Sequence, residues 1–323
     1  MGEAAQGEFV HIPVLFDECM EALAIKPDGI YVDCTAGGGG HSEGILQRLS
    51  SKGMLISLDK DDEALATCRE KAEAHPDKNW KLIKSDFSHV AEVLDEMNID
   101  KVDGILADLG VSSHQIDTAE RGFSYAVDGP LDMRMDETQK LSAYTVVNTY
   151  GEKELEEIFR LYGEERYAGR IASGIVRDRK EKPFTSTLQL AKSIASYMPS
   201  KARYEDQHPA RRCFQAIRIE VNHELDSVRM LLQEGPKRLS DGGRMAVISF
   251  HSLEDRIVKE EFRTLQDPCT CPKDFPVCVC GKKSLGKVLT RKPITAGEDE
   301  LKRNNRSHSA KLRVFERIEQ RGQ

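Results

Sequence analysis

Two periodicities of apolar and polar positions alternate along most of the chain. Short β-rich runs predict strands at residues 29–32, 54–58, 80–85, 104–109 and 244–250. Runs with apolar side chains every three or four positions predict helices at residues 16–23, 63–74 and 90–97, and another directly after Gly40. Strands that alternate with amphipathic helices predict right-handed βαβ crossovers, and hence an α/β fold with a parallel sheet covered on both faces.

Four consecutive glycines, residues 37–40, separate the first predicted strand from the helix that contains Ile45, Leu46 and Leu49. A strand, a glycine turn and a helix in this order let main-chain N–H groups approach a ligand at the positive end of the helix, with no Cβ in the way. The arrangement predicts a nucleoside-type cofactor site rather than a flexible loop.

The residues around the glycines favour one cofactor over another. A dinucleotide fingerprint needs a third glycine where Ser42 or Glu43 stands. Asp33, directly before the loop, would repel a pyrophosphate but suits the ammonium and sulfonium groups of S-adenosylmethionine. Asp59 lies about 20 residues beyond the first glycine, where an acid binds ribose hydroxyls in either case. Asp33 therefore favours S-adenosylmethionine.

Acids follow four successive predicted strands. They are Asp33, Asp59, Asp86 and Asp108, and Phe87 follows the third of them. Ligands of open α/β sheets bind beyond the carboxyl ends of the strands, which form one edge. A single acid at a strand end is often only a helix cap, but four in succession predict a site at this edge.

The alternation stops after the fourth strand. Residues 110–136 form a long loop of the kind that serves as a lid or binding loop, and 138–205 are helical in pattern throughout. A long helix at 210–232, a strand at 244–250, a helix with Ser252 as N-cap, and strands at 287–289 and 310–318 follow. The predicted organisation is an α/β domain in two parts, 1–136 and 206–323, with an all-helical insertion at 137–205.

Charge and composition limit the function classes. The 323 residues carry a net charge of −7, so contact with nucleic acid has to come from local basic clusters. Such clusters favour contact with a polyanion; they are Arg166, Arg170, Arg177, Arg179, Lys180 and Lys182, then Lys201, Arg203, Arg211 and Arg212, then Lys302, Arg303 and Arg306. No apolar run is long enough to span a membrane and no signal peptide is evident, so we expect a cytoplasmic protein.

Four of the eight cysteines cluster, at positions 269, 271, 278 and 280. Four thiolates could bind zinc tetrahedrally, but C-x-C is tighter than the usual spacing of zinc ligands. Reduced loop thiols therefore stay the preferred interpretation, and no metal ligand is predicted.

Several long motifs resemble one known family, the bacterial 16S ribosomal RNA (cytosine-N4)-methyltransferases, called RsmH or MraW. The matching segments are residues 33–42, 103–113, 121–125, 130–135, 162–166, 214–219 and 249–256, within a similarity that runs from about 11 to 314. The resemblance implies a Rossmann-like class I S-adenosylmethionine-dependent methyltransferase with a helical insertion. It also implies N4-methylation of a cytidine near the decoding centre, with 16S rRNA, within the 30S subunit, as partner.

The same motifs imply the cofactor contacts, and further residues are expected to contact the substrate. Cofactor contacts are expected at Gly39, Gly40, His41, Asp59, Phe87, Asp108 and Gln115. Substrate contacts are expected at Arg121, His251, Arg256, Asn304 and Arg306. Asp108 is the candidate acceptor for the cytosine N–H proton, and Ser249 and His251 compete for that role.

Two other classes of protein stay open on the sequence alone. One is a regulatory or assembly protein that keeps the nucleotide site without turnover. The other is a DNA or protein methyltransferase, but DNA amino-methylating enzymes usually carry an Asp/Asn-Pro-Pro-aromatic motif after the fourth strand. Here that place reads Asp108-Leu109-Gly110-Val111, so no DNA partner is expected.

Overall fold

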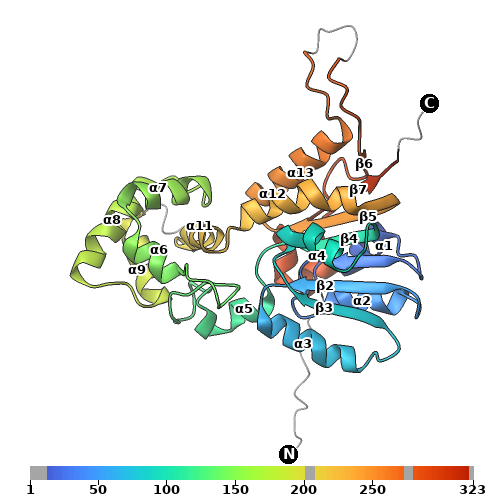
Figure 1. The fold of residues 1–323 in the computed structure, drawn as a ribbon. Coiled ribbons are helices and arrows are strands. Elements are labelled where there is room, and N and C mark those ends of the chain that lie inside the picture. The colour runs from blue at the N-terminus through green and yellow to red at the C-terminus, as the bar shows by residue number, and fades with distance from the viewer. Residues whose placement is uncertain (1–12, 201–207, 273–278, 320–323) are drawn as a thin grey trace, which may run out of the picture. The chain divides into compact units, whose positions relative to one another are not determined.

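One sheet organises the residues before 110 and after 227. In the computed structural model, which describes residues 13–200, 208–272 and 279–319, its strand order is β3-β2-β1-β4-β5-β7-β6 (Figure 1). The strands are β1 (Ile30–Asp33), β2 (Met54–Asp59), β3 (Asn79–Lys84), β4 (Val102–Asp108), β5 (Leu239–Ser249), β6 (Gly286–Val288) and β7 (Lys311–Arg317). The first five are parallel, and β7 is antiparallel to both of its neighbours. The predicted Rossmann-like class I fold is confirmed.

Helices cover both faces of this sheet because its strands are apolar on both sides. Along β4, Ile105 packs into one hydrophobic core and Leu106 into the other, and Val247 and Ile248 divide in the same way along β5. The covering helices are α1 (Phe16–Leu23), α2 (Gly40–Arg48), α3 (Asp62–Glu73), α4 (Val90–Glu96), α12 (Glu224–Glu234) and α13 (Ser252–Gln266). Among the described residues, no helix is both long and apolar enough to cross a bilayer.

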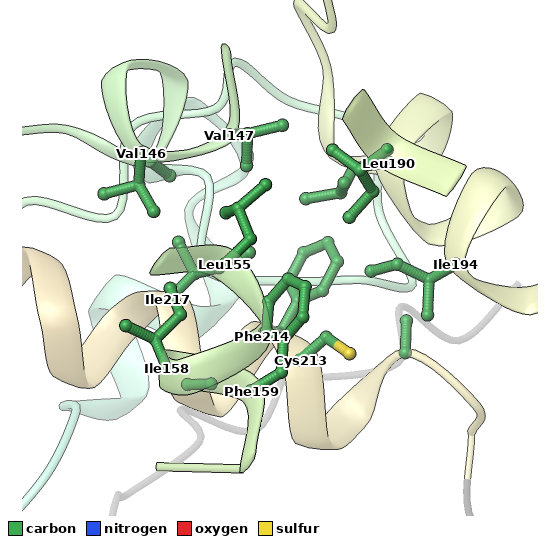
Figure 2. Close-up of a cluster of buried hydrophobic side chains, with 14 of the residues drawn as sticks. Val146, Val147, Leu155, Ile158, Phe159, Leu190, Ile194, Cys213, Phe214 and Ile217 are labelled. Atoms are coloured by element: carbon green, nitrogen blue, oxygen red, sulfur yellow. The ribbon is translucent and has the colours of Figure 1, made fainter. Parts of the chain in front are cut away.

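The second compact unit, Gly110–Ser227, is helical. Its elements are α5 (Ser113–Asp117), the 3-10 turn η2 (Ala119–Arg121), α6 (Ala143–Thr149), α7 (Glu152–Leu161), α8 (Ala168–Glu181), α9 (Thr187–Tyr197) and α11 (Arg211–Asn222). Their apolar stripes meet in one core, in which Leu155, Phe159 and Ile194 are fully buried beside Phe214 (Figure 2). The predicted stripes of α7, α8 and α9 supply much of this core.

The long loop after β4 belongs to the helical unit. It contains α5 and η2, and its Phe123, Leu131 and Met133 are buried in the helical core. Asn222 of α11 fastens it, because the side chain accepts from the Met135 N–H at 2.8 Å and donates to the Met133 carbonyl at 2.8 Å. The unit therefore begins earlier and ends later than the predicted insertion at 137–205.

The helix predicted at 210–232 is interrupted at His223, so the expectation of one continuous helix is wrong. His223 adopts the left-handed conformation with φ of 50°, and α12 starts at the next residue. Across the break, the Arg218 guanidinium donates to both carboxylate oxygens of Glu224 at 2.8 Å. A His at this break carries no glycine or proline signal, so the apolar pattern on either side reads as unbroken.

Candidate active site

The glycine loop after β1 is shaped as a cradle. Gly37 and Gly39 have φ of 47° and 77°, which a side chain rarely tolerates, and the Gly39 N–H donates to the Ala36 carbonyl at 2.7 Å. A Cβ added to Gly38 would meet no atom within 4 Å, so the outer side of the loop is open. Because α2 starts at Gly40, the main-chain N–H groups of its first turn are available to a ligand.

Asp33 lies beneath this cradle rather than on its surface. The residue is 0% exposed, and its oxygens accept from the Thr35 N–H at 3.1 Å and from the Ser42 hydroxyl at 2.6 Å. Burial raises the pKa of Asp33 to about 7. The expectation that Asp33 faces the cationic groups of a cofactor is therefore wrong. Ser42, which stands where the dinucleotide fingerprint has a glycine, supplies the hydroxyl that holds the carboxyl inside.

Asp59 stands at the end of β2 and supports the same loop. Its oxygens accept from the Gly37 N–H at 2.8 Å and the Asp61 N–H at 2.9 Å. Burial raises the pKa of the Asp59 carboxyl. Each carboxylate oxygen can accept a second hydrogen bond, and the residue is only half-buried, so Asp59 can still bind hydroxyl groups.

Asp86, after β3, acts as a helix cap. One oxygen accepts from the Ser88 N–H at 2.9 Å, and the other lies 3.1 Å from Lys60 Nζ. Burial tends to raise the pKa of the Asp86 carboxyl, but Lys60 and Ser88 outweigh it and lower the pKa below its usual value. Phe87 is half-buried at the start of the 3-10 turn η1 (Phe87–His89) and packs against the core of the sheet.

Asp108, at the end of β4, has the least satisfied carboxyl of the four. Its Oδ1 is buried and has no hydrogen-bond partner among the described residues, while the side chain as a whole is 27% exposed. Burial, followed by the charges of Asp33 and Glu254, raises the pKa of Asp108 to about 8. A buried acceptor without a partner costs about 1–3 kcal/mol, so this oxygen favours any ligand that brings a donor or a positive charge.

His41 lies beside Asp108 in the first turn of α2. Its Nε2 lies 3.1 Å from the Val14 carbonyl oxygen, which can only accept, so Nε2 carries the proton of this bond. Nδ1 lies 3.7 Å from the Asp108 carboxyl. The ring is 5% exposed and stacks on Phe16.

The end of β5 brings a second histidine to this edge. His251, not Ser252, is the N-cap of α13, and so the predicted cap is off by one residue. Neither ring nitrogen of His251 makes a hydrogen bond to a described residue, although Nε2 lies 3.1 Å from Glu254 Oε1. Ser249, the other competitor for the acceptor role, is 1% exposed and donates to a main-chain carbonyl of β7.

Glu254 is a residue of the site that the sequence prediction missed. It is 1% exposed, and its Oε2 accepts from the Phe250 N–H at 2.8 Å. Its charge contributes to the raised pKa of Asp108. The available signal was the three-residue spacing from His251, which is the spacing of a helix capping box.

Two predicted site residues lie in the helical unit and have structural contacts there. Gln115 is 5% exposed, and its side chain closes a capping box with Ser112 at the start of α5. Arg121 is 4% exposed and donates to the carbonyls of Arg134 and Met135 at 3.1 and 3.2 Å. Because its guanidinium is buried in these bonds, the prediction that Arg121 contacts substrate is corrected to a role in shaping the loop.

The other predicted substrate residues lie nearer the surface of the first unit. Arg256 is exposed on α13. Asn304 caps the 3-10 turn η4 (Asn305–Ser309) by accepting from the Arg306 N–H at 3.1 Å, and Arg306 is half-buried. Lys302 and Arg303, at the end of α14 (Glu298–Arg303), are exposed. Lys201 and Arg203 lie outside the described residues.

Comparison with known proteins gives relatives over nearly the whole chain. The model of the MraW methylase family matches residues 8–318. A protein of Caldicellulosiruptor saccharolyticus named "Ribosomal RNA small subunit methyltransferase H" is 56% identical over 310 residues, which cover 96% of this chain and 100% of the relative. Relatives of the same name from Lachnospira eligens and Clostridioides difficile are 53% and 50% identical over 311 residues; both matches cover 96% of this chain, and 98% and 100% of the relatives.

Proposed function

Because this chain belongs to the MraW methylase family, we propose that it methylates N4 of a cytidine in small-subunit (16S) ribosomal RNA, near the decoding centre. Family membership confirms that the chain is a methyltransferase and that S-adenosylmethionine is its methyl donor. The names of the relatives support small-subunit rRNA as the substrate. The sequence resemblance is the basis for proposing a cytidine, its N4 atom and the 30S subunit as the target. We expect the protein to act in the cytoplasm.

The residues at the carboxyl edge of the sheet fit the donor. Its ribose hydroxyls suit the second lone pairs of the Asp59 oxygens, and its adenine suits the half-buried ring of Phe87. Its amino-acid end suits the loop at Gly39, which has no Cβ, and the main-chain N–H groups in the first turn of α2, which starts at Gly40. S-adenosylmethionine supplies a methyl group activated by a positively charged sulfur.

The unsatisfied oxygen of Asp108 is the observation that carries the chemical proposal. The lone pair of cytosine N4 is delocalised into the ring, so attack on a methyl group needs an acceptor for the N–H proton. Asp108 lies beside the glycine loop, and its Oδ1 has no competing partner among the described residues. His251 is the second candidate acceptor, or a partner for the cytosine base itself.

The decisive test maps the methylated atom. Purified protein is incubated with labelled S-adenosylmethionine and either naked 16S rRNA or 30S subunits from a strain that lacks the enzyme, and nucleosides are analysed by mass spectrometry. We expect one labelled N4-methylcytidine per RNA. Donor binding without transfer to either substrate would support the regulatory protein, and label in DNA or protein would support the other methyltransferase classes.

The exposed side of α8 is our candidate for RNA backbone contact. Arg170, Arg177 and Lys180 are exposed and lie on one side of the helix by the 3.6-residue period. Arg179, which the sequence grouped with them, is half-buried and donates to the Val147 carbonyl at 2.7 Å. The RNA test therefore leaves Arg179 in place.

Replacing Arg170, Arg177 and Lys180 together by Ala should weaken RNA binding and leave donor affinity unchanged. Each lost phosphate contact lowers the slope of log K against log salt by about 0.7–0.9, so the slope should fall by roughly 2–3. Filter binding or fluorescence anisotropy over a salt series measures it. A variant with three other exposed lysines replaced, Lys52, Lys101 and Lys153, loses the same charge and should keep most of the slope. Equal slopes in both variants would leave α8 as a merely solvated surface.

A further inference from the structure

In the part that the structure describes, the connection between α13 and β6 consists of two arms, residues 267–272 and 279–285, which are anchored at their base. The Leu285 N–H donates to the Leu265 carbonyl at 2.8 Å, and the Val288 N–H donates to the Gln266 side chain at 2.7 Å. Leu265 and Leu285 also pack against the sheet core. Figure 1 shows the two arms continuing past the end of α13, away from the sheet. The described residues of these two arms include no buried apolar side chain, and Val279 is 73% exposed.

Three cysteines from the two arms lie close together. Their ligand atoms, Sγ of Cys269, Cys271 and Cys280, all lie within 4.8 Å of one another, and Sγ of Cys269 and Cys280 are 4.0 Å apart. A disulfide needs about 2.0 Å between its sulfurs, so this pair is not bonded. Around a tetrahedral zinc ion with Zn–S bonds of about 2.3 Å, the sulfurs are ~3.8 Å apart. The observed spacing is close to that of metal ligands.

The main chain around these cysteines suits thiolates. The Val279 N–H points at Cys271 Sγ at 3.3 Å, and such a donor stabilises a negatively charged sulfur. Gly281, directly after Cys280, has φ of 66° and turns the chain as only glycine does readily. Close thiolates repel one another, so this convergence favours a cation bound between the three sulfurs.

We propose that Cys269, Cys271 and Cys280 bind a zinc ion as thiolates and that this metal clips the two arms together. Cys278 lies outside the described residues, and the argument rests on the other three sulfurs. Zinc binding releases the thiol protons and gains its stability from folding of the arms. This proposal takes the place of the sequence-based interpretation of these cysteines as reduced loop thiols. It does not depend on the proposed methyl transfer.

The other described cysteines should not contribute to a metal-binding assay. Cys19, Cys34, Cys68 and Cys213 are buried. Burial raises the pKa of each of these thiols, and it raises that of Cys68 to about 12. They stay protonated and inaccessible at neutral pH, so any bound metal is held by the cysteines of the two arms.

The test measures metal in the full-length protein purified without chelators. Plasma mass spectrometry should find about one zinc per chain, and a thiol-reactive mercurial should release it to a colorimetric indicator. The double variant Cys269→Ser/Cys271→Ser should lose the zinc, whereas Thr270→Ala, in the same loop with every thiol kept, should retain it. Adding Co²⁺ to the metal-free wild type should give the charge-transfer and d–d absorption of a tetrahedral thiolate site.

Three results would overturn the proposal. They are wild-type protein without stoichiometric zinc and without the Co²⁺ spectrum, full zinc in the double serine variant, or loss of zinc from Thr270→Ala alone. The Co²⁺ spectrum needs only wild-type protein, so the test stands if the double variant fails to fold. Hydrogen exchange tests whether the metal holds the two arms together, because zinc removal should then speed exchange of the amides at 279–285. Unchanged exchange would rule out a structural role of the metal.

Discussion

Asp108→Asn lowers the single-turnover rate of methyl transfer by about 10²–10⁴-fold at saturating donor and RNA, the range expected for loss of a general base. The substitution keeps the shape of the side chain and removes its ability to accept a proton. Donor affinity should fall much less than the rate. Rapid-quench measurement of label transfer gives the rate, and calorimetry gives the affinity.

The pH profile provides a second readout of the same group. Since burial, with the charges of Asp33 and Glu254, raises the pKa of Asp108 to about 8, its carboxylate accumulates only as the pH rises through that value. Wild-type kcat/KM should therefore rise with pH and level off above about 8, and the Asn variant should lack this rise. Asp33, with its pKa raised to about 7, titrates in both proteins, so the comparison isolates Asp108.

Thermal stability controls for misfolding of the variant. A carboxyl whose pKa is higher in the folded than in the unfolded state destabilises the fold as the pH rises from ~4 towards the folded value. An amide lacks this cost, so Asp108→Asn should melt at the same or a higher temperature than wild type at pH ~8. A variant rate restored by saturating donor would make Asp108 a binding residue only, and would move the acceptor role to His251.

Asp59→Ala should weaken S-adenosylmethionine binding by at least tenfold. A charge-assisted hydrogen bond to a ribose hydroxyl contributes about 1.5–3 kcal/mol, and each 1.4 kcal/mol is about tenfold in affinity. The variant also loses the acceptor for the Gly37 N–H, which loosens the glycine loop and adds to the effect. Calorimetric titration with the donor measures the change.

Asp61→Ala is the matched control. Asp61 lies in the same turn and caps α3 by accepting from the Glu63 N–H at 3.0 Å. Its loss should cost about 0.5–2 kcal/mol of stability and leave donor affinity within a few-fold of wild type. Equal donor affinity in Asp59→Ala and wild type would remove Asp59 from the ribose site.

Most of the sheet could be predicted from the sequence because buried strands and amphipathic helices leave different periods. The short apolar runs located β1 to β4 to within two residues, whereas β5 begins five residues before the predicted strand at 244–250. The weaker runs near the C-terminus correctly predicted β6 and β7. The acids at the strand ends were located in the same way. Which of them supports the loop and which faces a ligand depends on side-chain contacts, so Asp33 was misjudged.

The remaining errors have a common physical cause. Arg121 looks like an RNA ligand in sequence because a guanidinium suits phosphate, but three-dimensional packing buries it against main-chain carbonyls. The apolar residues of the long loop, Leu131 and Met133, have no helical period although they fill the helical core. His223 breaks a helix that the pattern reads as unbroken. Neither the packing of Arg121, Leu131 and Met133 nor a left-handed turn at a histidine is encoded in a local pattern.

The helical unit has a consequence for how the chain is made. Strands β4 and β5 are neighbours in the sheet, with Ile105 opposite Met245, yet the whole of Gly110–Ser227 lies between them in the sequence. At about 5–20 residues per second, a ribosome needs roughly 6–24 s to synthesise that stretch of about 120 residues. During this time β4 has an unpaired edge, which can pair with other chains. The helical unit, with its largely local contacts, can fold while the sheet waits for β5 and then for β7 to emerge.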